Sequence, residues 1–142
     1  MSSPMSAPTD RPLASIVVPL LNEADAIERC VLSFDAQEYP LNRLELLIVD
    51  GGSTDGSTDR VRSMAVDRPW LRLVENPDRR ASAAFNRGIE SATGDVICLV
   101  GAHSIVGPDY VRRSVDALAD SGAGGVGGQL VHRGTDPKSK AI

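Results

Sequence analysis

The sequence predicts an α/β fold in which a mostly parallel sheet carries helices on both faces. Short apolar segments alternate along the chain with segments of helical spacing, in the order β-α-β-α-β-α-β-α-β. The three longer apolar segments, residues 14–20, 44–49 and 95–100, show little polar alternation, which is typical of parallel strands buried on both faces. A length of 142 residues suits one domain with one core.

The first strand and helix are predicted over residues 14–20 and 23–36. The strand is rich in β-branched side chains, and Pro19 is expected at its end because proline cannot donate a ladder hydrogen bond. Asn22 could cap the helix that follows. The apolar face of this helix consists of residues at helical spacing, namely Ile27, Val31 and Phe34.

The second strand ends at a polar, glycine-rich turn that extends from Asp50 to Ser57. Asp55 or Ser57 could cap the next helix, which Pro69 ends. The residues of this helix that are predicted to face inward are Val61, Met64 and Ala65.

A shorter third strand is predicted over residues 70–74, followed by a helix over residues 80–92 that Gly94 ends. The residues expected to pack closely on this helix are Ala83, Ala84 and Ile89. The fourth strand precedes a helix over residues 108–119, which begins at a proline.

The predicted domain covers residues 14–132, between a flexible tail at 1–13 and a loose tail at 133–142. Residues 122–128 fit the pattern G-x-G-x-x-G, but a dinucleotide-binding loop follows a strand and opens a helix. This segment follows a helix and leads into a predicted edge strand, residues 129–132, so we exclude that function.

Composition excludes several classes of protein. A net charge of −4 gives no electrostatic footprint for nucleic acid. No apolar run approaches the roughly 20 residues of a membrane span, and no signal peptide precedes the domain, so a cytoplasmic protein is expected. Cys30 and Cys98 lie in apolar segments and are expected to be buried, reduced thiols.

Polar residues follow strands one, two and four of the predicted sheet, at 19–23, 50–55 and 101–103. Open α/β sheets bind ligands beyond the carboxyl ends of their strands, and neighbouring strands lie about 5 Å apart. One nucleotide-sized ligand could therefore contact all three clusters. Asp50 can accept a hydrogen bond from a base or a ribose, and Gly51 lets the backbone approach a ligand closely.

A diphosphate needs positive charge, which a metal ion held at His103 could provide. The arginines that could serve instead are Arg79, Arg80 and Arg87. Taken singly, each cluster has a structural alternative: a turn with a helix cap at 50–55, a helix cap at 22–23, a plain loop histidine, or solvated surface arginines. Their convergence at the strand ends favours a ligand site.

The segments SIVVPLLNE (15–23), LIVDGGSTDGS (47–57), AFNRG (84–88) and ATGD (92–95) occur in the order and spacing of a known family. From about residue 14 to 132 the chain resembles family-2 glycosyltransferases, especially bacterial exopolysaccharide transferases of the succinoglycan-biosynthesis type. The resemblance implies a Rossmann-like GT-A fold. It also implies transfer of a sugar from a nucleoside-diphosphate-sugar, most often a UDP-sugar, to an acceptor in polysaccharide or cell-surface glycan biosynthesis.

The resemblance also assigns site residues. Those implied to bind the nucleotide-sugar are Pro19, Asn22, Glu23, Asp50, Gly51, Arg80, Gly101 and Ala102. Asp50 is expected to meet the base, and His103 to bind the divalent metal, Mg²⁺ or Mn²⁺, that neutralises the diphosphate. The expected partners are the nucleoside-diphosphate-sugar donor and a glycan or lipid-linked acceptor.

The chain departs from the family pattern mildly at Gly51, where many relatives have a second consecutive aspartate, and more seriously at Gly101. Gly101 replaces the first aspartate of the metal motif, which removes a hard oxygen ligand and is expected to weaken metal binding. The family's general base lies well past this motif, so we expect it beyond residue 142 and expect this chain to be an incomplete enzyme with weak or absent turnover. A non-catalytic nucleotide-binding or assembly module is the alternative.

Two further expectations concern assembly. Missing sequence could attach the protein peripherally to the inner face of the cell membrane. A truncated sheet would leave an exposed edge and an uncovered apolar face, which predicts oligomerisation or poor solubility.

Overall fold

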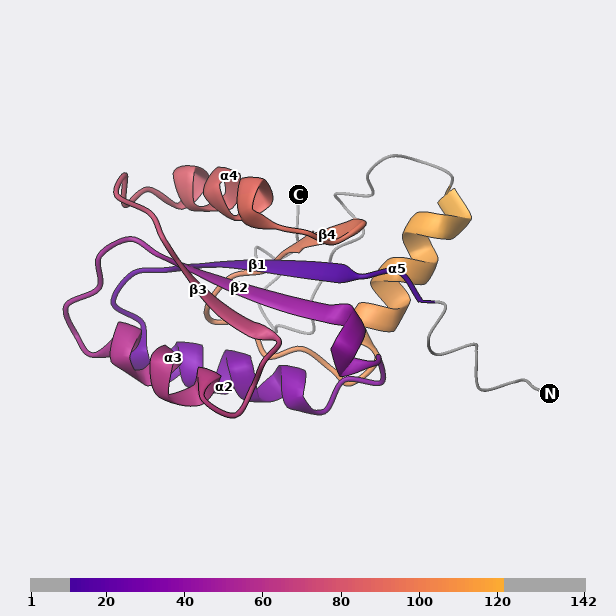
Figure 1. The fold of residues 1–142 in the computed structure, drawn as a ribbon, viewed down its shortest axis with the longest axis horizontal. Coiled ribbons are helices and arrows are strands. Elements are labelled where there is room, and N and C mark those ends of the chain that lie inside the picture. The colour runs from indigo at the N-terminus through magenta and orange to yellow at the C-terminus, as the bar shows by residue number, and fades with distance from the viewer. Residues whose placement is uncertain (1–10, 122–142) are drawn as a thin grey trace.

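The computed structural model describes residues 11–121 and has the predicted α/β fold (Figure 1). Parallel strands form a sheet in the order β3-β2-β1-β4. The strands are β1 (Ala14–Leu20), β2 (Leu44–Asp50), β3 (Leu71–Glu75) and β4 (Val96–Leu99). The helices are α2 (Ala24–Asp35), η1 (Leu41–Arg43, a short 3-10 helix), α3 (Ser57–Ala65), α4 (Ala81–Ser91) and α5 (Tyr110–Ser121). The predicted edge strand at 129–132 and the glycine-rich segment at 122–128 lie outside the described residues.

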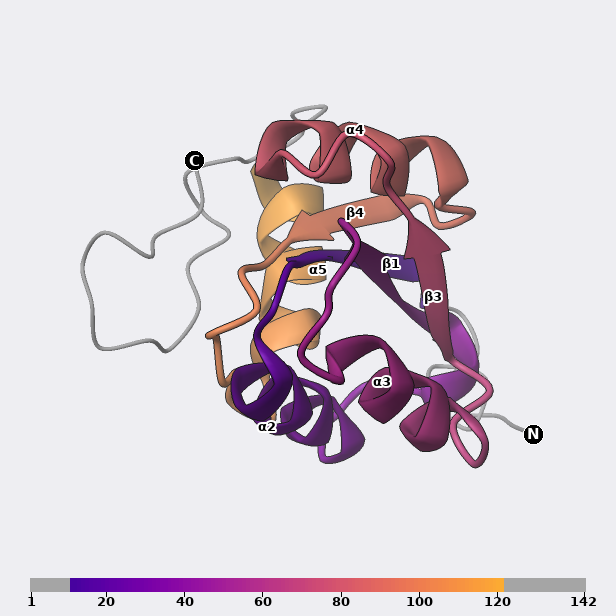
Figure 2. The ribbon, with the colours of Figure 1, turned by 90° about the vertical axis from the view of Figure 1, so that its left-hand side faces the viewer.

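Helices cover both faces of the sheet, as the sequence predicts (Figure 2). One face packs against α2, α3 and α5, and the other against α4. Side chains alternate along β1, because Ile16 and Val18 face α2 whereas Val17 faces α4. β2 lies between β1 and β3 and is buried at every residue. Within residues 11–121, no helix has the length and apolar character needed to cross a bilayer.

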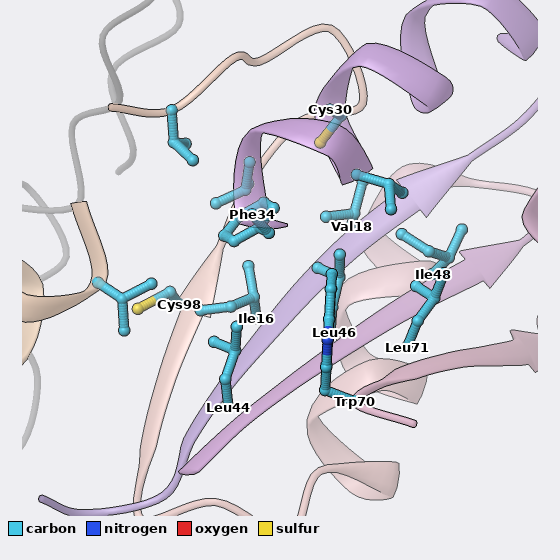
Figure 3. Close-up of a cluster of buried hydrophobic side chains, with 14 of the residues drawn as sticks. Ile16, Val18, Cys30, Phe34, Leu44, Leu46, Ile48, Trp70, Leu71 and Cys98 are labelled. Atoms are coloured by element: carbon cyan, nitrogen blue, oxygen red, sulfur yellow. The ribbon is translucent and has the colours of Figure 1, made fainter. Parts of the chain in front are cut away.

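The larger part of the core lies between the sheet and α2, α3 and α5 (Figure 3). Phe34 of α2 meets Tyr110 of α5 edge to face, with ring centroids 6.5 Å apart. Trp70, just before β3, joins the same cluster. Cys30 and Cys98 are free and buried there, as predicted. Burial raises the pKa of both thiols to about 12, so they stay protonated and unreactive at neutral pH.

The opposite face of the sheet carries α4 in close contact with β1. A Cβ on Gly88 would overlap the side chain of Val17, so only glycine lets the helix lie this close. Ala84 is buried one turn earlier, as predicted. The prediction that Ile89 packs inward is wrong, because its side chain is 42% exposed. Positions 84 and 88 share one face of the helix, and position 89 is turned away from it.

Candidate functional site

The carboxyl ends of the strands, at the left of Figure 1, surround a pocket of about 240 Å³. The loops after β1, β3 and β4 and the first turns of α4 line it. Its polar and charged lining residues are Glu23, Asn76, Arg79 and His103. Its apolar lining residues are Pro19, Leu20, Leu21, Ala81, Ala84 and Ala102. Pockets for drug-sized ligands span about 300–1,000 Å³, so this one holds part of such a ligand.

The loop after β2 caps the start of α2. The backbone N–H of Glu23 donates to Ser57 Oγ at 3.0 Å, and that of Ala24 donates to Asp55 Oδ2 at 3.2 Å. A helix leaves these amides without intrahelical partners. Here their acceptors are side chains that lie 34 and 31 positions later in the sequence. No side chain at the helix's own N-cap position makes a capping bond.

Asn22 joins the loops after β1 and β2 instead of capping α2. Its backbone has a φ of 54°, a left-handed conformation that asparagine adopts more readily than most residues. Its Oδ1 accepts a hydrogen bond from the Thr54 N–H at 2.7 Å, and its own N–H donates to Ser53 Oγ at 2.9 Å. Asn22 therefore lies at the rim beside the β2 loop and does not line the pocket.

Asp50 ends β2 and organises the turn that follows. Its Oδ1 accepts hydrogen bonds from the N–H of Ser53 at 3.1 Å and from the Oγ of the same residue at 2.7 Å. Its Oδ2 accepts one from Thr58 Oγ1 at 2.9 Å. This carboxylate therefore stabilises its own loop, as expected if residues 50–55 form a structural turn. Its oxygens still have acceptor capacity for a further donor.

Gly51 and Gly52 allow the loop after β3 to lie against the loop after β2. A Cβ on Gly51 would lie 3.1 Å from Arg79 Cα, and one on Gly52 would lie 3.2 Å from a guanidinium nitrogen of Arg79. Gly52 also has a φ of +96°, which glycine adopts without strain. Arg79 itself has a φ of 74°, a rare conformation for a residue with a long side chain. In this conformation Arg79 lines the pocket.

Arg80 does not line this pocket. Its guanidinium donates two hydrogen bonds to the Asp78 carboxylate, at 2.7 Å and 2.9 Å. It lines a neighbouring cavity of about 470 Å³ along α4, together with Asn86 and Arg87. Of the two adjacent arginines, the structure thus brings Arg79 to the pocket that Glu23 and His103 share.

The loop after β4 contributes Gly101, Ala102 and His103. Ala102 is buried and lines the pocket. Gly101 is exposed, and a Cβ there would meet only Ser104 Oγ, at 3.8 Å, so the loop has room for a side chain at this position. His103 reaches across to the loop after β1, where its Nε2 lies 2.9 Å from Glu23 Oε2.

This pair decides which metal chemistry the pocket can support. In the part of the chain that the structure describes, no group of three or more His, Cys, Asp or Glu side chains gathers to hold a metal ion. Glu23 and His103 nevertheless present one oxygen and one nitrogen ligand side by side at the pocket. Mg²⁺ in nucleotide sites is often held by one or two carboxylates together with phosphate oxygens and water. A two-ligand set of this kind fits a divalent ion that a diphosphate completes.

Asn76 is a site residue that the sequence reasoning missed. It is 4% exposed, its Nδ2 donates to the Arg80 carbonyl at 3.2 Å, and its Oδ1 accepts from the Asp78 N–H at 3.2 Å. Its own backbone N–H donates to the Asp50 carbonyl at 2.8 Å. These bonds fix the loop that carries Arg79. The available signal was its position, directly after the third strand at the edge where the other clusters lie.

A parallel α/β sheet with a pocket at the carboxyl ends of its strands has the arrangement in which open α/β domains bind ligands. More particularly, the chain belongs to glycosyl transferase family 2, whose model matches residues 15–141. It is 30% identical over 120 residues to glycosyltransferase AglE of Haloferax volcanii, covering 84% of this chain and 40% of AglE. It is 37% identical over 113 residues to the succinoglycan biosynthesis protein ExoA of Rhizobium meliloti, covering 78% of this chain and 34% of ExoA. The chain thus spans two fifths or less of these relatives.

Solved structures give the same assignment. Mannosyltransferase PcManGT from Pyrobaculum calidifontis, in complex with GDP-Man and Mn²⁺, superposes with a TM-score of 0.73 at 37% identity, over 80% of this chain and 34% of that chain. S. aureus TarS in complex with UDP-GlcNAc superposes with a TM-score of 0.63 at 18% identity, which shows a shared fold alone. The predicted GT-A fold and the resemblance to succinoglycan-type transferases are confirmed.

Proposed function

We propose that this chain binds a nucleoside-diphosphate-sugar at the pocket beside Glu23, Arg79 and His103, as the donor-binding part of a glycosyltransferase of polysaccharide or cell-surface glycan biosynthesis. One observation carries the proposal: a guanidinium and a carboxylate–imidazole pair surround one pocket at the carboxyl edge of a family-2 sheet. Ligands of open α/β sheets bind at this edge. The similarity to PcManGT, which was solved with GDP-Man and Mn²⁺, supports it.

The pocket is assigned to the diphosphate and the attached sugar. Arg79 supplies a guanidinium there, whose planar fork of donors matches phosphate oxygens. The nucleoside is assigned to the ends of β1 and β2, beside Pro19 and Asn22. Asp50 accepts a hydrogen bond from it through its remaining acceptor capacity, and Gly51 lets the ligand lie close to the backbone.

A divalent cation, Mg²⁺ or Mn²⁺, is assigned to His103. When bound, such an ion neutralises charge on the departing diphosphate. With Gly101 in place of an aspartate, the site holds this ion more weakly than relatives that have both ligands. The glycan or lipid-linked acceptor, its general base and any attachment to the inner face of the cell membrane are assigned to regions that only the longer relatives cover.

Calorimetric titration of the purified chain with UDP, GDP and ADP, with and without Mn²⁺, tests the proposal. The family resemblance favours UDP, whereas PcManGT was solved with GDP-Man. We expect binding of UDP in preference to the other two, with a dissociation constant that falls when Mn²⁺ is present. A preference for GDP would move the donor to the guanosine class. A folded chain that binds neither UDP nor GDP would overturn the proposal.

A non-catalytic nucleotide-binding or assembly module is the second candidate, and Gly101 is the observation that favours it. The variant Gly101→Asp separates the two, because the loop has room for the side chain. A gain in Mn²⁺-dependent nucleotide affinity would indicate a transferase site that is weakened at one position. No gain would favour the non-catalytic module.

A further inference from the structure

Glu23 and His103 come from different loops, 80 residues apart, and meet at the mouth of the pocket. The imidazole is 75% exposed and the Glu23 side chain 34% exposed. An exposed pair of this kind contributes at most about 1 kcal/mol to stability. Holding the fold together is therefore a poor explanation for the contact. The pair is better placed to act on something that enters the pocket.

Glu23 is the one carboxylate among the described residues that line this pocket. Asp50 lies at the same edge of the sheet, but it does not line the pocket, and Ser53 and Thr58 hold its carboxylate in place beside the β2 loop. Across the part of the chain that the structure describes, His103 is the only polar partner of the Glu23 carboxylate. Its oxygens are thus the available hard ligands beside the imidazole.

The separation of the two ligand atoms suits a common metal ion. Octahedral Mg²⁺ holds its ligands at about 2.0–2.1 Å, so two adjacent ligands on one ion lie about 3.0 Å apart. Glu23 Oε2 and His103 Nε2 are 2.9 Å apart. The two atoms are thus close enough to share one ion once Nε2 is deprotonated and the imidazole and carboxylate turn so that both lone pairs point at it.

The backbone of Glu23 is held in place before any ligand arrives. Its N–H donates to the buried Ser57, and the preceding Asn22 is bound to Ser53 and Thr54. Ligand residues with supported backbones lose less freedom when an ion binds, which strengthens the site.

We propose that Glu23 is the carboxylate ligand of the divalent-cation site in this chain, taking the place of the aspartate that Gly101 replaces. His103 is the second protein ligand, and water and diphosphate oxygens complete the coordination. The inference rests on the proposed function for the diphosphate, but the two protein ligands alone already bind the ion weakly. Cation and nucleotide then strengthen each other's binding by the same factor, as linkage requires.

Titration of Mn²⁺ alone, followed by electron paramagnetic resonance of the free ion, is the first test. Glu23→Gln is expected to weaken Mn²⁺ binding about tenfold, a typical effect of disturbing a metal site. The matched control is Asp25→Asn, which removes the same charge two residues away from a side chain that is 86% exposed and outside the pocket. The control is expected to change Mn²⁺ affinity less than about twofold, since an exposed charge acts through solvent.

A rescue experiment provides the second test. In the Glu23→Gln background, Gly101→Asp returns a carboxylate to the loop after β4 and is expected to restore Mn²⁺ affinity to within about threefold of the parent chain. Equal Mn²⁺ affinities of Glu23→Gln and Asp25→Asn would overturn the inference, and so would a parent chain that does not bind Mn²⁺. Thermal unfolding of each variant shows whether it remains folded.

The same variants titrated with UDP or GDP separate this inference from the proposed function. If the parent chain binds the nucleotide and Mn²⁺ strengthens that binding equally in Glu23→Gln, the donor site stands and the Glu23 assignment is wrong. If the parent chain binds Mn²⁺ through Glu23 but no nucleotide, the inference stands and the donor proposal is wrong.

Discussion

Each end of the sheet carries a glutamate, but the two side chains have different surroundings. At the amino ends, Glu45 in β2 is 8% exposed. Its Oε1 accepts hydrogen bonds from Ser15 Oγ at 2.7 Å and the Thr93 N–H at 2.9 Å. Its Oε2 accepts from Thr93 Oγ1 at 3.0 Å and an Arg72 guanidinium nitrogen at 2.8 Å. Each oxygen of this carboxylate thus accepts two hydrogen bonds from the protein itself.

At the carboxyl ends, Glu23 has one polar partner among the described residues, His103, and lines an open pocket. Its backbone is also held in place, because its N–H donates to Ser57 Oγ. The support, however, reaches the main chain and leaves the carboxylate available. The comparison teaches that a stabilising polar cluster uses its side-chain acceptors internally, whereas a binding cluster supports the backbone and leaves them for the ligand.

The largest effect on stability is expected from breaking the closed cluster, which consists of Glu45 and the residues that donate to it, Ser15, Arg72 and Thr93. Glu45→Gln replaces charged hydrogen bonds with neutral ones and leaves a donor where acceptors are needed, so it is expected to lower the free energy of unfolding by about 3 kcal/mol. Chemical denaturation measures this loss. Glu90→Gln, at an exposed position on α4, is the control and should change stability by less than about 0.5 kcal/mol. Equal effects of the two substitutions would contradict the comparison.

The closed cluster also predicts a pH dependence. Burial alone would raise the pKa of Glu45, but the hydrogen bonds from Thr93, Ser15 and Arg72 outweigh burial and lower it. A carboxyl whose pKa is lowered by folding stabilises the fold at pH values above the ordinary glutamate pKa. This stabilisation is lost as the pH falls through the folded-state pKa. Denaturation midpoints of the parent chain should therefore fall on acidification below about pH 5, and those of Glu45→Gln should fall less steeply. Parallel curves would assign the acid sensitivity to other carboxylates.

An intermediate effect on stability is expected from weakening the support of the open cluster, which is the Glu23–His103 pair at the pocket. Ser57→Ala removes the acceptor for the Glu23 N–H and a partner of Asp55, so it is expected to cost about 1–2 kcal/mol, as loss of a helix cap does. It should also weaken Mn²⁺ binding, because the Glu23 backbone is freed. Ser63→Ala, exposed on the same helix, is the control. Unchanged Mn²⁺ affinity in Ser57→Ala would show that the capping loop does not position Glu23.

The smallest effect on stability is expected at Arg79, and it has the opposite sign. Arg79→Gly relieves the left-handed backbone at a φ of 74° and should stabilise the fold by about 1 kcal/mol, while nucleotide binding weakens because the guanidinium is lost. Arg79→Lys keeps a positive charge and the strain, so it should retain more nucleotide affinity without the gain in stability. Thermal unfolding and calorimetry measure the two effects. A variant Arg79→Gly that binds nucleotide normally would remove Arg79 from the site.

Most of the fold could be predicted from sequence, because β1, β2 and β4 are largely apolar runs, and the two longest of them, β1 and β2, form the centre of the described sheet. The prediction at Ile89 is wrong for a physical reason. Hydrophobicity marked it for the core, but the contact of Gly88 with β1 sets the rotation of α4. The informative signal is a glycine in the interior of a helix, which marks a close approach of the helix to its neighbour.

The site was predictable in outline and not in its contacts. The loops of Glu23, Asp50 and His103 could be located because each follows a strand, and the carboxyl ends of neighbouring parallel strands lie together, where open α/β sheets bind ligands. The sequence prediction assigned Arg80 to the site, whereas Arg79 lines the pocket, with a left-handed φ angle that the sequence does not indicate. Nor did it find Glu45, although a lone charged residue in an apolar strand is a signal of a buried, satisfied carboxylate.

The capping of α2 by a distant loop has a consequence for the order in which the molecule assembles. α2 has 12 residues, and a helix of that length is marginal in water on its own. Its first amides find partners only after β2 has formed and the loop beyond it has closed. The segment from β1 to the start of α3 should therefore fold as one cooperative unit. In hydrogen exchange, the amides of Glu23 and Ala24 would then report how often the rim of the pocket opens.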